Sequence, residues 1–297
     1  MRNDDEKESG MASQPSNPTV HRRQLGAELR RLRKAAGLGI EQVAAELGCS
    51  QTRVSRIETG KGRATARPSD VTKLCELYHV TDQQQIDLLL QMLGNSQKRG
   101  WWAPYNDVLP SGLEVYVGLE SSARTERAWE PLLVHGLLQT PDYARTVFRS
   151  GAIHRPSDID ALVHVRLERQ KLISRADSPL DLWAILDEAV IRRPLGGADI
   201  MRAQLQHLID MSALPNVVVQ VIPNQKGAHP GLWGAFSLLE FEEDAPVVYV
   251  DSPGGNLYLE KRADVRRFAS IFDLLRATAL DPDESAALIR HAAEDMR

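Results

Sequence analysis

Apolar residues recur at helical spacing along the first third of the chain, and glycines interrupt them at short intervals. Residues 22–36 carry three leucines one turn apart among arginines, which predicts an amphipathic helix that ends at Gly37. Residues 40–47 predict a second helix that ends at Gly48. The inward positions of these two helices are Leu25, Leu29, Leu32, Val43, Ala44 and Leu47.

A third short helix follows after a turn. Cys49 forms the turn, and Ser50 is a good N-cap for a helix over residues 51–60, in which Val54 and Ile57 face inward. Ala44 in the preceding helix is small enough for two helices to cross closely, and Gly48 supplies the turn that such pairs need. The pattern predicts a helix-turn-helix. Two alternatives are a helical bundle whose basic face is simply solvated and a helix-turn-helix that contacts only proteins.

Two more helices are expected to complete an all-α bundle of about five helices. Residues 68–80 begin with Pro-Ser and place Val71, Leu74, Leu77 and Tyr78 inward, and Thr81 then precedes a longer helical run. The apolar stretch 86–93 is dense. Core packing explains it, and a dimer or interdomain contact is the alternative.

The period of the pattern changes in the second half of the chain. Helices are expected at 111–130, from Thr140-Pro141 onward, and at 156–175, 198–212, 261–278 and 283–296. Strands are expected at 180–186, 216–223, 234–241 and 246–252, with a short one at 256–261. The segments 234–241 and 246–252 are separated by an acidic turn and predict a hairpin. Together these elements predict an α+β domain with a mainly antiparallel sheet.

The distribution of charge also distinguishes the helical first third of the chain from the remainder. The formal net charge is −4, but residues 21–67 hold 11 Lys and Arg against 4 Asp and Glu, whereas residues 68–297 carry a balance of −9. A compact basic module joined to a large acidic one is typical of a DNA-binding domain with an attached domain of another function. Hydrophobic residues make up 42% of the chain, an ordinary globular value.

We therefore expect four segments: a disordered tail at 1–20, a helix-turn-helix domain at 21–97, a junction at 98–110 and an α+β effector and dimerisation domain at 111–297. Trp101, Trp102 and Tyr105 make the junction aromatic, so we expect them to pack on the second domain; a pocket wall or hinge is the alternative. Cys49 and Cys75 form no disulfide framework, and no secretory or membrane-spanning run is present. A cytoplasmic, nucleoid-associated protein is expected.

The third helix presents polar side chains that suit a major groove. Gln51, Thr52, Ser55 and Arg56 lie on its exposed faces near the N-terminus, where a recognition helix meets base edges. Gln can bind adenine, Arg can bind guanine, and Thr or Ser can reach either base edges or phosphate. Lys61 and Arg63 follow at once and are expected to hold phosphates. Double-stranded DNA is the expected partner.

The run GLGIEQVAAELGCSQTRVSRIETGK (37–61) resembles the helix-turn-helix of the phage-repressor and xenobiotic-response-element type. This resemblance implies a lambda-repressor-like fold, with Gln51, Thr52 and Arg56 facing bases and Arg53, Thr59 and Lys61 facing the backbone. It also implies an internal ion pair between Arg33 and Glu58. The sequence departs from the family at Gly39-Ile40, where a phosphate-binding Gln is usual, and Gln42 lies on another face.

No catalytic motif, cofactor motif or metal-ligand spacing is present, so neither an enzyme nor a metal or cofactor site is expected. Asp187-Glu188 more simply opens a helix, and the histidines at positions 135, 154, 164, 207 and 229 are scattered singly. The best candidate for a ligand or partner loop lies between two strands and offers Gln225, Lys226 and His229.

The segments RGWWAPYNDVLP, EPLLVHGLLQTPDYAR, LWAILDEAVIRRPLGG and LPNVVVQVIP resemble actinobacterial regulators with a C-terminal domain of uncharacterised function, including WhiJ-like regulators. This resemblance implies a transcription regulator and a small partner protein encoded by a neighbouring gene. We expect a homodimer that senses a partner or a small-molecule effector, because one short helix makes few base contacts. An antitoxin-like interaction protein that regulates its own promoter is the alternative, and an enzyme with a DNA-binding appendage comes third.

Overall fold

The computed structural model divides the chain into two compact units, Met1–Gly100 and Trp101–Arg297. We describe each unit by itself. The described residues are 18–60, 66–97, 100–110, 112–151, 155–242, 244–252 and 255–296. Of the tail expected at 1–20, residues 1–17 lie outside the described residues, and residues 18–20 belong to the first helix.

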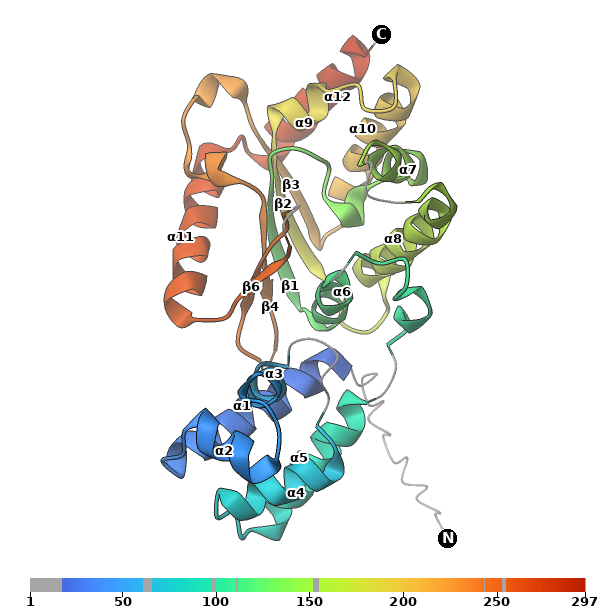
Figure 1. Ribbon diagram of the computed structural model, residues 1–297. Helices are drawn as coiled ribbons and strands as arrows, with labels where there is room; N and C mark the ends of the chain where they lie inside the picture. Colours follow the sequence, from blue (N-terminus) through green and yellow to red (C-terminus); the bar gives the residue numbers. More distant parts are fainter. Residues whose placement is uncertain are drawn as a thin grey trace, which may run out of the picture. The chain divides into compact units, whose positions relative to one another are not determined.

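The first unit is a helical bundle (Figure 1). Its helices are α1 (Pro18–Ala35), α2 (Ile40–Leu47), α3 (Gln51–Thr59), α4 (Pro68–Leu77) and α5 (Gln83–Ser96). The predicted inward residues form one core, with Leu29, Val43 and Val71 fully buried. Leu47 and Leu77 pack against this core and stay partly exposed. Burial of one apolar face per helix is what stabilises such short helices.

The second unit builds a six-stranded sheet between helices. Its strands are β1 (Thr125–Glu130), β2 (Asp181–Asp187), β3 (Val217–Ile222), β4 (Phe236–Glu240), β5 (Val247–Val250) and β6 (Leu257–Leu259). Its α-helices are α6 (Leu113–Ser122), α7 (Pro141–Ser150), α8 (Ile159–Ser174), α9 (Glu188–Arg192), α10 (Ala198–Ser212), α11 (Arg262–Thr278) and α12 (Pro282–Asp295). Short 3-10 turns lie at Ala103–Tyr105, Gly136–Leu138, Pro156–Asp158, Asn224–Lys226 and Pro230–Trp233.

The strand order is β3-β2-β1-β4-β5-β6. β1, β2 and β3 run parallel, while β4 pairs antiparallel with both β1 and β5, and β6 pairs antiparallel with β5. Antiparallel pairings therefore predominate, which confirms the predicted fold class and the predicted hairpin of β4 and β5. The parallel half is the part made from strands that alternate with helices, as parallel pairing requires.

The helix predicted over 111–130 is wrong in its second half. α6 ends at Ser122, and Thr125–Glu130 forms β1, a central strand of the sheet. The sequence of β1, TERAWE, carries charged residues at three of its six positions, so it lacks the apolar character expected of a strand inside a sheet. Glu126 in particular hides the strand character of β1, because a glutamate is rarely buried. Here it is buried because Tyr116 and His135, from other segments, contact its carboxylate.

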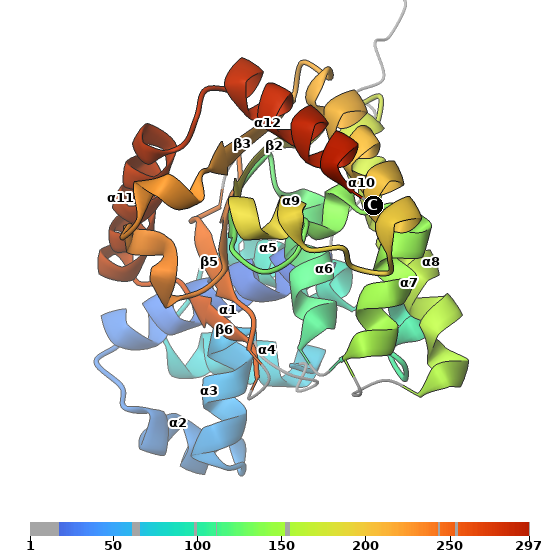
Figure 2. The ribbon, with the colours of Figure 1, turned by 90° about the horizontal axis from the view of Figure 1, so that it is seen from above.

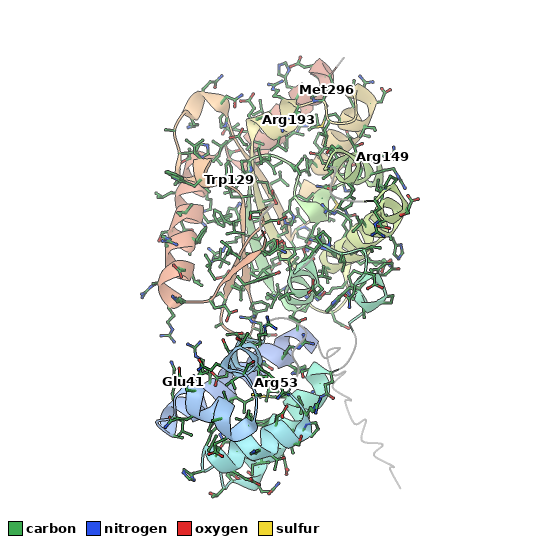
Figure 3. All side chains as sticks on the ribbon, in the orientation of Figure 1. Glu41, Arg53, Trp129, Arg149, Arg193 and Met296 are labelled. Atoms are coloured by element: carbon green, nitrogen blue, oxygen red, sulfur yellow. The ribbon has the colours of Figure 1, made fainter. Side chains whose placement is uncertain are left out.

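The sheet separates two layers of helices (Figures 1 and 2). α11 covers one face, where Phe272 and Leu275 pack on a cluster that includes the fully buried Trp129, labelled in Figure 3. α6, α10 and α12 pack against the other face together with the loop before α7. Trp102 is buried against α8 and α6 residues and Tyr105 packs beside it, as predicted. Trp101 does not follow the prediction, because it is 39% exposed and stands edge-on to Trp102.

Candidate nucleic-acid interface and a buried polar network

The turn between α2 and α3 has the geometry that its sequence predicts. Gly48 ends α2 in the left-handed region at φ 64°, a conformation that favours glycine. The Ser50 hydroxyl accepts a hydrogen bond from the Arg53 backbone N–H at 3.2 Å, which caps α3. Both ends of the turn are therefore specified locally, and they set the direction in which α3 leaves α2.

α3 keeps a polar face free of the core. Val54, Ile57 and Glu58 are buried, whereas the predicted base-contacting side chains Gln51, Thr52 and Arg56 are exposed, and Ser55 is half-buried. These four side chains share one side of the helix, because positions 51, 52, 55 and 56 fall within about 140° around an axis with 3.6 residues per turn. The structure thus brings the predicted base-contacting set together. Lys61 and Arg63, predicted to hold phosphates, lie outside the described residues.

Two of the side chains predicted to face phosphates have partners within the helical unit. Arg53, labelled in Figure 3, donates from Nη2 to Asp70 Oδ2 at 2.7 Å. The same carboxylate oxygen accepts from the Arg67 backbone N–H at 2.8 Å, so it ties the first turn of α3 to the start of α4. The Thr59 hydroxyl donates to the Ser55 carbonyl at 2.7 Å. The structure leaves both phosphate roles as predictions.

A buried ion pair fixes α3 to α1. Arg33 donates from Nε and Nη2 to the two carboxylate oxygens of Glu58 at 2.6 and 2.9 Å, and from Nη1 to the Leu38 carbonyl at 2.8 Å. The hydrogen bond to Glu58 raises the pKa of Arg33, although burial opposes it. This bidentate geometry is the strongest that an arginine and a carboxylate make. The ion pair that the family resemblance implies is confirmed.

The start of α2 departs from the family as its sequence indicates. Gly39 stands at the N-cap without a side chain, and its backbone N–H donates to Gln42 Oε1 at 2.8 Å. The side-chain oxygen of Gln42 therefore accepts a hydrogen bond within its own helix end. The end of α2 is held from α4, where Lys73 Nζ donates to the Glu46 carbonyl.

The loop predicted to bind a ligand or partner does not gather its three candidates. Gln225 and Lys226 are exposed on a 3-10 turn, whereas the His229 side chain is only 4% exposed and lies edge-on to the Trp129 ring at 5.1 Å. Trp129 Nε1 donates to the Gly231 carbonyl at 2.8 Å, so the loop is seated on the sheet. At its tip Trp233 is 97% exposed.

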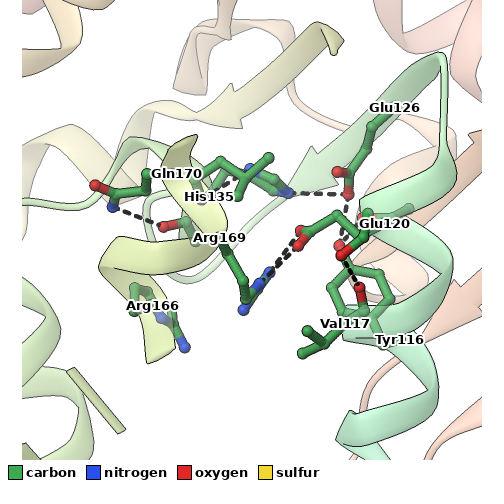
Figure 4. A network of polar contacts seen from close by, with 12 residues as sticks. Tyr116, Val117, Glu120, Glu126, His135, Arg166, Arg169 and Gln170 are labelled. Atoms are coloured by element: carbon green, nitrogen blue, oxygen red, sulfur yellow. Dashed lines mark hydrogen bonds and ion pairs between the residues drawn. The ribbon is translucent and has the colours of Figure 1, made fainter. Parts of the chain in front are cut away.

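A buried polar network in the second unit was not foreseen (Figure 4). Glu126 Oε1 accepts from the Tyr116 hydroxyl at 2.5 Å and lies 3.1 Å from His135 Nε2. Nearby, Arg169 donates from Nε and Nη2 to both oxygens of Glu120, at 2.7 and 2.6 Å. Each of these five residues is buried. The sequence does not reveal the contacts of His135, because its partners are not its neighbours along the chain.

Burial and pairing compete over the charges of this network. Burial opposes ionisation of Glu126 and His135, but their mutual attraction outweighs it, so it lowers the pKa of Glu126 and raises the pKa of His135. Burial raises the pKa of Glu130, at the end of β1, to about 7. Burial and the charge of Arg169 lower the pKa of Arg166 to about 10. Closely packed groups of both signs are thus held in the interior.

Within the described residues, no helix is both long and apolar enough to cross a membrane. The same residues contain no group of three or more His, Cys, Asp or Glu side chains placed to share a metal ion.

Comparisons with known families agree with this division of the chain. Residues 24–89 match a helix-turn-helix domain, which makes the protein a DNA-binding regulator by class. Residues 113–291, more than half of the chain, match a domain of unknown function, DUF5753. The chain belongs to the DUF5753 family. Searches among curated proteins and among solved structures give no match.

Proposed function

We propose that the protein is a sequence-specific transcription regulator of the xenobiotic-response-element type, which inserts α3 into the major groove of its operator. The observation that carries this proposal is the exposed face of α3 in a unit that matches a helix-turn-helix domain. Gln51 and Thr52 project from the N-capped end of a helix whose opposite face packs in the core, and Arg56 lies further along the same exposed side. Such a helix end has donors and acceptors available for base edges.

Phosphate contacts are proposed for Arg53, Thr59, Lys61 and Arg63, and they would hold the unit on DNA without specifying sequence. Arg53 would do so with one edge of its guanidinium, because Asp70 holds Nη2. The expected family contact at the start of α2 is replaced by the Gly39–Gln42 hydrogen bond. With one anchor fewer per half-site, we propose that two copies bind together as a homodimer.

We further propose that the second unit dimerises and senses a small partner protein or a small-molecule effector, in a cytoplasmic protein associated with the nucleoid. The likeness to WhiJ-like actinobacterial regulators supports this assignment. We keep the division into a tail at 1–20, a DNA-binding domain at 21–97, a junction at 98–110 and an effector domain at 111–297 as part of this proposal.

The experiment that tests the proposal is an affinity measurement at fixed salt. The operator is first selected from random duplexes with the full-length protein. Arg56→Ala and Gln51→Ala should each weaken binding by about 1–3 kcal/mol and relax specificity at one base pair. Arg30→Ala removes the same charge from an exposed position of α1 and serves as the matched control. Equal effects of Arg56→Ala and Arg30→Ala would overturn the base-contact assignment.

Phosphate contacts give a different signature. Lys61→Ala should weaken binding to selected and unrelated duplexes alike, and it should reduce the slope of log affinity against log salt by roughly one. A slope that stays at the wild-type value would remove Lys61 from the phosphate-contacting set while leaving the base contacts intact.

A further inference from the structure

One face of the sheet in the second unit carries polar side chains over β1, β4 and β5. Ala128 pairs with Ser237, and Ser237 pairs with Tyr249, so these residues share a face. Glu126 and Glu130 share it as well, because side chains alternate along β1. The buried Leu239 and Val247 lie beside Glu126 on this face, and on β2 and β3 it carries only apolar side chains, Leu182, Ala184, Leu186, Val217, Val219 and Val221. The polar side chains of this face are therefore confined to one half of the sheet.

Three buried polar atoms in this region have no hydrogen-bond partner among the described residues. They are Glu126 Oε2, Arg166 Nε and the Tyr249 hydroxyl. Ser237 approaches the Glu126 carboxylate but completes no hydrogen bond to Oε2. A buried polar atom without a partner destabilises the fold by about 1–3 kcal/mol, and more when it is charged. Three of them surround one network, so a single ligand bound there would meet several of these groups at once.

Other polar groups of the network already have hydrogen-bond partners. These structural pairs differ from Arg166 and Tyr249, each of which has a polar atom without a partner among the described residues. Glu120 and Arg169 satisfy each other through two short hydrogen bonds. Among the residues that the structure describes, Arg166 gives one hydrogen bond, from Nη1 to Gln139 Oε1 at 2.9 Å, and its guanidinium lies 4.8 Å from the centre of the Phe148 ring. The Tyr249 ring stacks on Tyr116 at 4.1 Å, which fixes the ring while its hydroxyl stays unused. The available groups are thus held rigidly by their neighbours.

The atoms without a partner differ in chemical character. Glu126 Oε2 is a carboxylate acceptor, and Arg166 Nε is a donor. An N–H group of a ligand would satisfy Glu126 Oε2, and an acceptor atom on the same ligand would satisfy Arg166 Nε.

The region also lies where the chain changes direction across the sheet. β1 is followed along the chain by β2 on one side, whereas β4 comes in on its other side with opposite direction. Glu130 ends β1, and Asp251 follows β5, which runs parallel to β1 because both are antiparallel to β4. Glu130 and Asp251 therefore lie at the same edge of the sheet.

We infer that this half of the sheet is an effector site for a small amine that also carries an oxygen acceptor, as amino acids, amino alcohols and amino sugars do. The amine would lie against Glu126 and Glu130, and its acceptor would meet Arg166 and the Tyr249 hydroxyl. This inference rests on the proposed sensing role of the second unit and names its ligand class.

The test uses thermal unfolding of the full-length protein followed by tryptophan fluorescence. All five tryptophans lie between residues 101 and 233, so the signal reports the second unit alone. The probes are the twenty L-amino acids, ethanolamine and glucosamine, each at 10 mM, with acetate as a probe that lacks the amine. At about a hundredfold excess over Kd, a bound probe should raise the melting temperature by roughly 5–10 °C, and acetate should not.

Tyr249→Phe is the sharpest variant, because it removes a hydroxyl that has no partner. Without a ligand it should fold as stably as wild type, but it should bind the active probe about tenfold more weakly. Tyr258→Phe is the matched control: its hydroxyl donates to the Gly112 carbonyl at 2.6 Å, so the change lowers stability and leaves probe affinity unchanged. Glu126→Gln should abolish the shift, with circular dichroism showing whether the fold is retained.

The outcomes separate the two proposals. If no amine probe stabilises the wild-type protein, or if Tyr249→Phe and Tyr258→Phe respond to the active probe equally, the effector site is overturned even where operator binding is intact. If a probe stabilises the protein through Tyr249 but no duplex is selected, the effector site stands and the regulator proposal fails.

Discussion

Glu58→Ala breaks the ion pair that joins α1 to the recognition helix and leaves Arg33 buried without its carboxylate. Arg33 would lose two hydrogen bonds of 2.6 and 2.9 Å and keep only the one to the Leu38 carbonyl. Removal of one member of a buried pair lowers the free energy of unfolding by about 3–5 kcal/mol. A helical unit of this size is stable by roughly 4–12 kcal/mol, so the loss is a large fraction of the total.

Urea unfolding followed by two signals measures this loss in the right part of the molecule. Circular dichroism at 222 nm reports the helices of both units, whereas tryptophan fluorescence reports only the second. The variant should therefore show an early circular dichroism transition that the fluorescence lacks. Operator affinity should fall in parallel at temperatures where the first unit is partly unfolded.

Two further variants make the reasoning refutable. Arg31→Ala removes the exposed member of the pair with Glu28, and it should leave the unfolding curve almost unchanged because solvent screens that pair and Glu28 keeps its hydrogen bond from Gln85. The double variant Arg33→Met/Glu58→Leu should recover most of the lost stability, since the uncompensated charge is gone. A loss of stability in Glu58→Ala no larger than that in Arg31→Ala would refute the stabilising role of the buried pair.

Two other predictions follow from close packing and from burial. Gly26→Ala would place a Cβ 2.5 Å from the Ile57 carbonyl oxygen, so it should displace α3 and weaken operator binding; Gly94→Ala, whose Cβ meets nothing within 4 Å, should be neutral or stabilising in the same assays. The pKa of Glu130 is raised to about 7, so the folded chain binds the proton of Glu130 more tightly than the unfolded chain does. The melting temperature of the second unit should therefore fall as the pH rises from about 5 to 7.5. Glu130→Gln should flatten this pH dependence. The groups that act on Glu130 are His135, Glu126, Arg166 and Asp251.

The helix-turn-helix could be predicted because its information is local. Gly48 and Ser50 mark the two ends of one turn, and each acts on residues at most a few positions away. The same holds for Thr140, whose hydroxyl accepts from the Tyr143 N–H and starts α7 where its sequence indicates. Caps and apolar periodicity decide such elements with little help from the rest of the fold.

The polar half of the sheet could not be predicted because its information is distributed. Glu126 looks like a surface residue until Tyr116 and His135, which come from α6 and the loop before α7, are placed around it. For the same reason β1 resembled the end of a helix. His135 is visible in the sequence, but a single histidine does not identify its partner.

The position of β1 in the sheet also determines the order in which the two units fold. Its pairing with β4 joins Thr125 to Glu240 and spans more than a third of the chain, whereas the contacts of α2 with α3 form between near neighbours. Pairings between distant segments form slowly, and local helices form early. A refolding molecule should therefore regain its DNA-binding helices before β4 and β5 complete the region around Glu126 and Tyr249. During that interval its base-contacting helix would already be folded, whereas the second unit could neither dimerise nor respond to an effector.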